Sequence, residues 1–361
     1  MEGFGWYTYE VVKRLVEQHP EHEFILFFDR KYDEKFVFGK NATPVVLNPP
    51  ARHPILFYIW FEHSVKRALK KYKADLFLSP DGYLSLKSNV KQIGVIHDIN
   101  FEHNPQDIPS TMRKYLCKYF PKFAQKASHI LTVSAYSKQD ICATYKIPED
   151  KVTVAWNGAS DKFKPISEEQ KTKVRMKYSS GNPYFLFVGA LHPRKNVGRL
   201  IQAFELFKEK NPSSNHKLVI VGEELFGNKL GGIEISESIR SNIQFTGHVA
   251  LEDLAELMAA AQIFTYVPYF EGFGIPLVEA MKCGTPILSA NKTSLPEVAG
   301  DAALYCDPFS VEDIAEKLET LANDNEIQIN LSKLGLNRGQ LFDWDHTANG
   351  VWDVICKVHQ Q

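Results

Sequence analysis

Short apolar runs alternate with helix-like stretches along the chain, and this alternation limits the possible folds more than any other feature. Strands that alternate with helices predict parallel sheets with helical crossovers, which is a doubly wound α/β fold. In the first half, the runs expected to be buried strands are 24–29, 76–79, 92–97 and 129–134. The helix-like stretches between them include 62–73 and 111–126.

A second series of apolar runs begins after Lys164 and predicts a second domain of the same class. Its expected strands are 184–189, 217–222, 243–247, 261–267 and 285–289, and its expected helices include 197–210, 251–260 and 311–322. The boundary is expected between 163 and 182, where Pro165, a charged helix and a Ser-Ser-Gly-Asn-Pro stretch interrupt the strand pattern. The 361 residues suffice for two domains, 1–165 and 166–344. Ligands of such folds bind at the carboxyl ends of the strands, so a site in the cleft between the domains is expected.

The N-terminal segment departs from this pattern. Gly3-Phe4-Gly5 is expected to be a glycine loop that opens a helix over 9–18. A doubly wound domain normally has a strand before such a loop. The first strand of domain 1 is therefore expected to be missing from this chain.

Composition excludes several classes of function. The formal net charge is −1, which gives no basis for a nucleic-acid partner. The five cysteines are scattered and form no Cys-x-x-Cys pair, as expected for the reduced thiols of a cytoplasmic protein. The most apolar run, 55–61, is about a third of the length that spans a bilayer.

The segment from Glu271 to Met281 combines two carboxylates with a glycine-rich turn. Glu271 and Glu279 stand eight residues apart, with Gly272 and Gly274 between them. The apolar residues that follow have the spacing of a half-buried helix, so the glycines are expected in a loop that leads into a helix N-terminus. Such a terminus attracts anions, whereas a carboxylate beside it suits sugar hydroxyls. Phosphate and sugar together indicate a nucleotide sugar; the alternative is that each glutamate merely stabilises the helix start.

A second motif, Gly189 to Asn196, follows an expected strand and precedes an expected helix. Gly189 permits a tight backbone turn, and Arg194 and Lys195 bring two positive charges to the same strand end. Arginine can bind two phosphate oxygens at once and lysine acts as a compact charge, so the pair suits a leaving nucleoside diphosphate. The alternative is a solvated basic turn. A P-loop is excluded, because the glycine before the lysine and the Ser or Thr after it are missing.

The order and spacing of these motifs resemble the retaining glycosyltransferases of the GT-B superfamily. The similar group is the large family four, which includes glycogen-synthase-like enzymes and bacterial mannosyltransferases. The segments that carry the resemblance are 3–5, His97-Asp98, 132–134 with Ser137, 154–158, 189–196, Gly222-Glu223, 247–249, 271–279 and 342–344. They span nearly the whole chain. The resemblance implies an acceptor-binding first domain, a nucleotide-sugar-binding second domain, and a last helix at 345–361 that packs back on the first.

The resemblance also implies roles for residues of the second domain. The family residue that matches Glu279 binds the ribose hydroxyls, and the one that matches Glu271 contacts the donor sugar. Backbone N–H groups of Gly272, Phe273 and Gly274 are expected nearby. Arg194 and Lys195, together with the turn at Gly189, are expected to hold the diphosphate.

In the first domain, the resemblance places His97 beside the donor sugar and the reaction centre, with Asp98 orienting its ring. The alternative is a core histidine whose ring is satisfied by Asp98. The backbones of Gly3 and Gly5 are expected near the phosphate or the acceptor. In the second domain, the backbone of Val249 is expected near the nucleobase.

Asp343-Trp344-Asp345 matches Asp-x-Asp, the metal-binding pattern of the other glycosyltransferase fold. Its position near the end of the chain makes a bridging or helix-capping role the expectation. No catalytic metal and no cofactor is therefore expected. Arg194, Lys195 and helix N-termini are expected to stabilise the charge of the leaving group instead.

The implied activity is transfer of a hexose from a nucleoside diphosphate sugar to a hydroxyl of a saccharide or lipid-linked saccharide, with retention of anomeric configuration. GDP-mannose is the favoured donor, and UDP-glucose or another UDP-hexose is the alternative. A protein that binds nucleotide sugars without catalysis is a further alternative. A nucleotide-dependent oxidoreductase is disfavoured, because neither Gly3-x-Gly5 nor Gly272-x-Gly274 has the third glycine of a dinucleotide fingerprint.

The stretch 55–73 places an apolar and aromatic run before a run of five cations. One interpretation is a surface that touches a membrane carrying a lipid-linked acceptor, which would make the protein membrane-peripheral. The favoured interpretation is a buried helix start followed by a solvated basic face.

Overall fold

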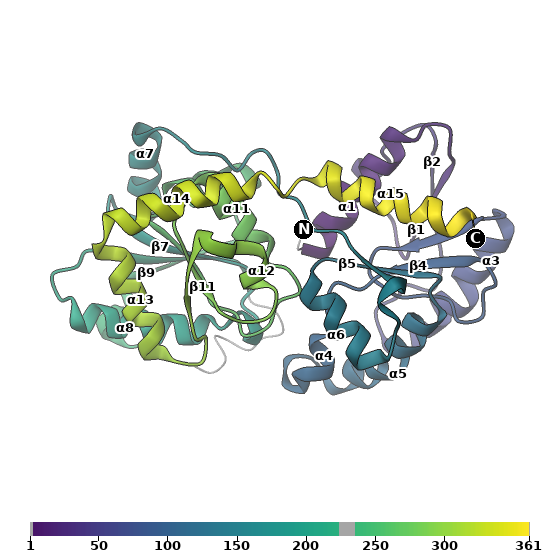
Figure 1. Cartoon of the computed structure of the whole chain (residues 1–361), viewed down its shortest axis with the longest axis horizontal. Helices are drawn as coiled ribbons and strands as arrows, with labels where there is room; N and C mark the ends of the chain where they lie inside the picture. The colour runs from purple at the N-terminus through teal and green to yellow at the C-terminus, as the bar shows by residue number, and fades with distance from the viewer. Residues whose placement is uncertain (1–2, 224–234, 361) are drawn as a thin grey trace. The chain divides into compact units, whose positions relative to one another are not determined.

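The computed structural model describes residues 3–223 and 235–360, and the chain divides into two compact units. Unit 1 comprises Met1–Gly158 and Asp343–Gln361, and unit 2 comprises Ala159–Phe342 (Figure 1). Every strand pair in the described part of the chain is parallel. The α/β class expected from the alternating pattern is therefore confirmed.

Unit 1 holds two parallel sheets. The first pairs β1 (Phe24–Phe28) with β2 (Ala42–Val46), and the second has the order β3 (Leu76–Ser79), β4 (Lys91–Val95), β5 (His129–Thr132) and β6 (Val152–Val154). Its longer helices are α1 (Gly3–Gln18), α5 (Ser110–Lys126), α6 (Ala135–Tyr145) and α15 (Trp344–Gln360), and α4 (Asn100–His103) is a single turn. The last helix, α15, packs against α1, β4 and β5, and the carbonyl of Val358 accepts a 3.0 Å hydrogen bond from Lys91 Nζ.

The first described element is a helix, not the expected glycine loop. α1 begins at Gly3, six residues before the helix start expected at Tyr9. Phe4 and Tyr7 lie on one face of its first turn, and the centroid of each ring is 4.7 Å from that of His97. These contacts fix the first turn, so the backbone of Gly3 and Gly5 is helical and the prediction of a loop is wrong.

The stretch from residue 54 to residue 71 is continuously helical. It consists of α2 (Pro54–Ile59), a π-helical turn (Trp60–Val65) and α3 (Lys66–Lys71). The wider π turn places Trp60 and Phe61 in succession against the interior, where both are buried. No residue of α2 itself is buried and Ile55 is 63% exposed, so the expected buried helix start is wrong for α2 and burial begins at Trp60. The cations of α3 are exposed, as expected for a basic outer face. The membrane contact stays a prediction. Among the described residues, no helix combines the length and apolar character needed to cross a bilayer.

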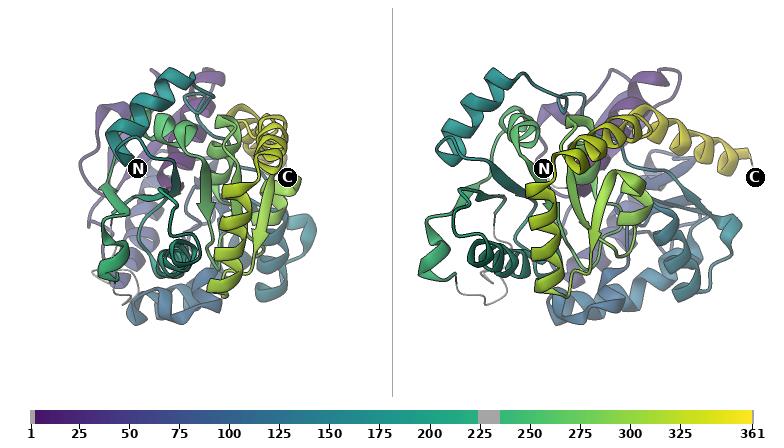
Figure 2. Two further views of the ribbon diagram at one scale, coloured as in Figure 1. Left: turned by 90° about the vertical axis from the view of Figure 1, so that its left-hand side faces the viewer. Right: turned by 60° about the vertical axis from the view of Figure 1, so that its left-hand side comes forward.

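The described residues of unit 2 form one six-stranded parallel sheet. Its order is β12 (Ala303–Cys306), β11 (Ile287–Ala290), β10 (Ile263–Tyr266), β7 (Tyr184–Val188), β8 (Lys217–Val221) and β9 (Ile243–Gly247). Its helices are α7 (Glu168–Ser179), α8 (Val197–Lys210), α9 (Glu237–Arg240), α10 (Leu251–Ala260), α11 (Ile275–Cys283), α12 (Leu295–Ala299), α13 (Val311–Asn323) and α14 (Asn325–Gly339). α8 packs against α13, and α11 packs against α10, α12 and α14, so helices cover both faces of the sheet (Figures 1 and 2).

The chain passes from unit 1 to unit 2 after Gly158, earlier than the boundary expected at residue 165. A Cβ atom on Gly158 would lie 2.4 Å from the backbone nitrogen of Trp344, so the two connecting stretches run in backbone contact here. Thr347 reinforces this contact, since its hydroxyl donates to the carbonyl of Trp156. Long-range packing of this kind leaves no mark in the local sequence pattern, which explains the displaced boundary.

Candidate functional site

The site in unit 2 lies at the carboxyl ends of two neighbouring strands. β7 leads into the turn that carries Arg194 and Lys195, and β10 ends at Tyr266, just before the loop that carries Glu271. Because β7 and β10 pair in parallel, both loops leave the same edge of the sheet. This edge is where doubly wound folds bind their ligands.

The basic turn is held in a fixed shape. Arg194 and Lys195 lie on a 3₁₀ turn (Pro193–Lys195). The backbone N–H of Arg194 donates a 3.3 Å hydrogen bond to Nδ1 of His192, which precedes this turn. Asn196 follows in the left-handed region, with φ of 61°. Its side-chain amide donates to the carbonyls of Val267 at 2.9 Å and Pro308 at 2.7 Å. Asn196 thereby ties the turn to the loops that follow β10 and β12.

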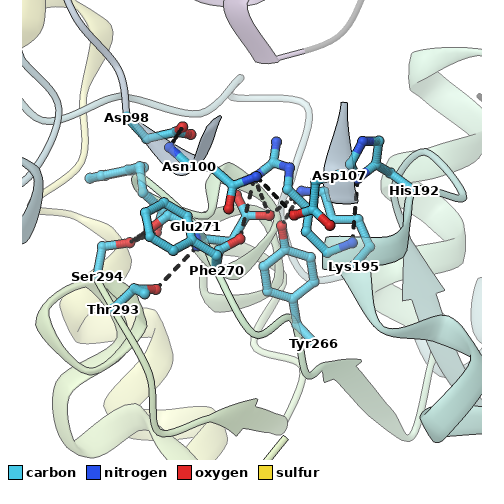
Figure 3. Close-up of polar contacts among 12 residues, drawn as sticks. Asp98, Asn100, Asp107, His192, Lys195, Tyr266, Phe270, Glu271, Thr293 and Ser294 are labelled. Atoms are coloured by element: carbon cyan, nitrogen blue, oxygen red, sulfur yellow. Dashed lines mark hydrogen bonds and ion pairs between the residues drawn. The ribbon is translucent and has the colours of Figure 1, made fainter. Parts of the chain in front are cut away.

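Both cations share the carboxylate of Glu271. Lys195 Nζ lies 2.5 Å, and the Arg194 guanidinium 3.1 Å, from the same oxygen of Glu271 (Figure 3). Arg194 also donates to the carbonyl of Phe270 at 3.3 Å, and Lys195 donates to the hydroxyl of Tyr266 at 2.7 Å. Glu271 is only 6% exposed. The residues that the sequence assigned separately to phosphate and to sugar are therefore one connected network.

The charges in this network determine its protonation. Burial by itself would raise the pKa of Glu271, but the neighbouring Arg194 and Lys195 cations lower it below its usual value. Glu271 is therefore ionised at neutral pH. Burial and the nearby Glu271 charge raise the pKa of Tyr266 well above its usual value, so this phenol stays neutral.

Two residues that sequence reasoning missed hold the backbone around Glu271. The hydroxyl of Ser294 donates to the carbonyls of Glu271 at 2.9 Å and Phe273 at 3.1 Å, and the hydroxyl of Thr293 accepts from the N–H of Glu271 at 3.2 Å. Thr293 has a φ of 54°, which is rare for a β-branched residue. Strained backbone of this kind gathers at functional sites. The available signal was a polar Thr-Ser pair between an apolar strand and the next helix.

The Gly-Phe-Gly segment leads directly into α11, as expected. Gly274 is the N-cap with φ of 98°, and α11 starts at the next residue, Ile275. Glu279 is the fifth residue of α11, one turn from its start, and Glu271 lies on the preceding loop. Within residues 3–223 and 235–360, the side chain of Glu279 forms no hydrogen bond or ion pair. It is partly exposed, yet burial around its carboxyl raises its pKa to about 8.

Glu279→Gln is expected to remove a loss of stability that the wild type shows as pH rises. The pKa of this carboxyl is about 4.3 in the unfolded chain and about 8 in the folded protein. Between these values only the unfolded form has released its proton, so the wild type loses up to about 1.4 kcal/mol of unfolding free energy per pH unit. Glutamine does not titrate. The melting temperatures of the two proteins should therefore diverge from about pH 5 to pH 8 in favour of the variant, and a constant difference contradicts the raised pKa.

In unit 1, His97 is a buried histidine with partners other than the one expected. Its Nε2 lies 2.9 Å from the carbonyl of Pro80, and the rings of Phe4 and Tyr7 pack on it. Asp98 instead accepts from the backbone N–H of Asn100 at 3.0 Å, so the prediction that Asp98 orients or satisfies the ring is wrong. The ring turns toward Pro80 because the loop after β3 supplies a carbonyl at hydrogen-bond distance.

Burial lowers the pKa of His97 to about 4, so its ring is neutral at pH 7. The backbone carbonyl of His97 accepts a 3.0 Å hydrogen bond from the hydroxyl of Ser137. Both ends of His97 are therefore fixed by unit 1 itself.

The remaining predicted positions lie at strand ends of unit 2 or at a helix start of unit 1. Gly189 follows β7 with φ of 149°, and Val249 follows β9, two residues before α10. Asp343 accepts a 2.6 Å hydrogen bond from the backbone N–H of Asp345 at the start of α15. The carboxylate of Asp345 in turn accepts a 2.6 Å hydrogen bond from the guanidinium of Arg14. The expected capping role of this Asp-x-Asp segment is confirmed. Among the described residues, no three His, Cys, Asp or Glu side chains gather in a way that could hold a metal ion.

Comparison with known proteins identifies the class. The model described as Glycosyltransferase Family 4 matches residues 1–163, and that described as Glycosyl transferases group 1 matches residues 168–338. The O-antigen chain mannosyltransferase B of Escherichia coli is 30% identical over 96% of this chain and 93% of its own. Sucrose-phosphate synthase of Thermosynechococcus elongatus superimposes with a TM-score of 0.82 at 18% identity, over 99% of this chain and 94% of its own. HepE of Anabaena, solved with UDP and glucose, superimposes with a TM-score of 0.76 at 18% identity, over 98% of this chain and 96% of its own.

The fold with its two Rossmann-like domains is thus that of the GT-B glycosyltransferases. Within that class, the chain belongs to glycosyltransferase family 4.

Proposed function

We propose that this protein is a retaining hexosyltransferase that takes its sugar from a nucleoside diphosphate. The observation that carries the proposal is the network at one strand edge, where Arg194 and Lys195 converge on the buried Glu271. One turn into the following helix, Glu279 lacks a partner within the described residues. Cations suit the diphosphate, and the carboxyl groups of Glu271 and Glu279 suit the hydroxyls of the two sugars.

In the proposed reaction, the bond from the anomeric carbon to the diphosphate oxygen breaks, and the acceptor oxygen bonds to the same face of that carbon. The acceptor proton passes to the leaving diphosphate. Arg194 and Lys195 neutralise the charge that develops on the leaving group. Glu271 accepts from a hydroxyl of the donor sugar, and Glu279 accepts from the ribose. His97 is neutral at pH 7 because its pKa is near 4, which supports a role in positioning rather than as an acid.

GDP-mannose is the proposed donor, and a saccharide or lipid-linked saccharide is the proposed acceptor. The support is the 30% identity to an O-antigen chain mannosyltransferase over nearly the full length of both chains. A UDP-hexose is the second candidate, because the same fold accommodates UDP and glucose in HepE.

The test is a thermal-shift screen with GDP, UDP, GDP-mannose and UDP-glucose, followed by turnover of any donor that raises the melting temperature. We expect one base to stabilise the protein and its sugar to be transferred. The double variant Lys195→Ala with Glu279→Ala is expected to lose both effects, since it removes the lysine cation that binds the diphosphate and the carboxyl group that binds the ribose. Near-full transfer by this double variant rules the proposal out. Stabilisation by a nucleotide sugar without any turnover would point to a non-catalytic binding protein.

A further inference from the structure

We propose that Tyr266 is a positioning residue, whose hydroxyl anchors Lys195 and Glu271 while Lys195 engages the leaving diphosphate. This inference rests on the function proposed above. Tyr266 does not belong to either motif that sequence reasoning singled out, and it is the last residue of the buried strand β10.

The ring of Tyr266 is immobilised by its surroundings. Tyr266 is fully buried at the end of β10. Its ring stacks on Phe264 at 5.8 Å and on Phe187 at 6.4 Å between centroids, and a Cβ atom on Gly274 would lie 3.6 Å from it. Contacts on several sides fix where the hydroxyl points, which is toward the cation pair (Figure 3).

One hydroxyl serves both charged groups. Lysine only donates hydrogen bonds and an ionised carboxylate only accepts them. Tyr266 Oη therefore accepts from Lys195 Nζ, at 2.7 Å, and its own proton is directed to Glu271. Lys195 also lies over the Tyr266 ring, 5.2 Å from its centroid. The phenol is thus a neutral group that contacts both members of the Lys195–Glu271 ion pair.

A neutral anchor matters because Glu271 and the diphosphate compete for the same cation. A lysine side chain is flexible, and holding it in one place costs conformational entropy. If Glu271 alone held Lys195, the arrival of an anion would release the ammonium from its only fixed point. The hydroxyl of Tyr266 carries no charge and does not oppose the anion, so Lys195 can turn toward the diphosphate while it keeps this contact.

The test compares Tyr266→Phe with Tyr184→Phe, a matched control in the same sheet. Tyr184 is equally buried, and its hydroxyl donates to the carbonyl of Leu257 at 2.7 Å, away from the cations. Each variant removes one buried hydroxyl and keeps its ring. We expect Tyr266→Phe to lower kcat by about tenfold to a hundredfold, as for the loss of a hydrogen bond to a charged group. Tyr184→Phe should stay within about twofold of the wild type in kcat at a similar or larger cost in melting temperature.

Two further readouts separate positioning from mere stability. Without the Tyr266 proton, Glu271 loses a donor, so the acid limb of the pH–rate profile should move to higher pH in Tyr266→Phe only. Acetylation of Lys195, followed by mass spectrometry without any nucleotide, should be several times faster in Tyr266→Phe than in the wild type and in Tyr184→Phe.

The proposal is overturned if the acetylation rate of Lys195 is the same in all three proteins. It is also overturned if the two variants lose kcat equally, because a general loss of stability then explains the effect. The acetylation measurement needs no substrate. Failure of the wild type to bind or turn over any nucleotide sugar would defeat the proposed function, and the labelling would still decide whether Tyr266 anchors Lys195.

Discussion

Glu271→Ala is expected to lower sugar transfer by about a thousandfold while nucleoside diphosphate binding is retained. The variant removes the contact to the donor sugar and the carboxylate that holds Lys195 at 2.5 Å and Arg194 at 3.1 Å. Loss of one preorganised electrostatic partner typically costs about 10² to 10³ in rate. Binding of the diphosphate should persist, because two like charges about 4 Å apart repel by about 4 kcal/mol at a dielectric constant of about 20, and the variant removes a negative charge beside an anion site.

The measurements are initial rates of transfer and calorimetric titration with GDP or UDP. Glu252→Ala is the matched control, since Glu252 pairs with Lys162 in the same unit but at the exposed surface. That variant should transfer sugar at a rate within about twofold of the wild type, because exposed ion pairs contribute little. Glu271→Gln keeps an oxygen for Lys195 without its charge and should fall between the wild type and alanine. Retention of more than about a tenth of the wild-type rate by Glu271→Ala would show that the network is dispensable.

Gly222→Ala is expected to destabilise unit 2 by about 3 kcal/mol or more. Gly222 follows β8 with φ of 143°, and a Cβ atom there would lie 2.0 Å from the carbonyl oxygen of Gly189. Backbone cannot yield to such a contact without separating the ends of β7 and β8. Because β7 leads into the turn that carries Lys195, nucleotide binding should weaken as well. The melting temperature should fall by about 6 °C or more.

Gly247→Ala provides the control for Gly222→Ala. Gly247 ends the neighbouring strand, and its carbonyl accepts a 3.0 Å hydrogen bond from the N–H of Gly222. Its φ of 67° is also in the left-handed region, but a Cβ atom there would meet nothing within 4 Å. Only backbone strain of about 1 to 2 kcal/mol is expected. Equal melting temperatures for the two variants would contradict the steric explanation.

Local patterns were sufficient for most of the secondary structure. The expected runs at 76–79 and 243–247 are β3 and β9, and the expected helices at 197–210 and 251–260 are α8 and α10. In these segments the apolar spacing reports which face is buried, so the sequence carries the signal itself. Three short strands were missed: β2, β6 and β12. Each lies beside a predicted strand and pairs with it, namely β1, β5 and β11.

The errors at the N-terminus and at His97 have one cause. Glycines near residues 3–5 indicate a loop when they are considered alone, yet Phe4 and Tyr7 pack on His97, more than 80 residues away, and stabilise a helix. Likewise, the neighbour in sequence, Asp98, was expected to hold His97, and the carbonyl of Pro80 does so in the structure. Partners distant in the chain replaced the local ones.

The sequence by itself determined the α/β class, the two series of strands, the loops after strands that carry Arg194, Lys195 and Glu271, and the helix that carries Glu279. These are matters of periodicity and of turn residues, which are local. Only the tertiary structure decided that Glu271 is shared by both cations, that Tyr266 bridges Lys195 and Glu271, and that Glu279 has a raised pKa without a partner in the described residues. Hydrogen bonds and pKa values depend on distance and burial, and both are set when β7 and β10, some 75 residues apart in sequence, become neighbours in one sheet.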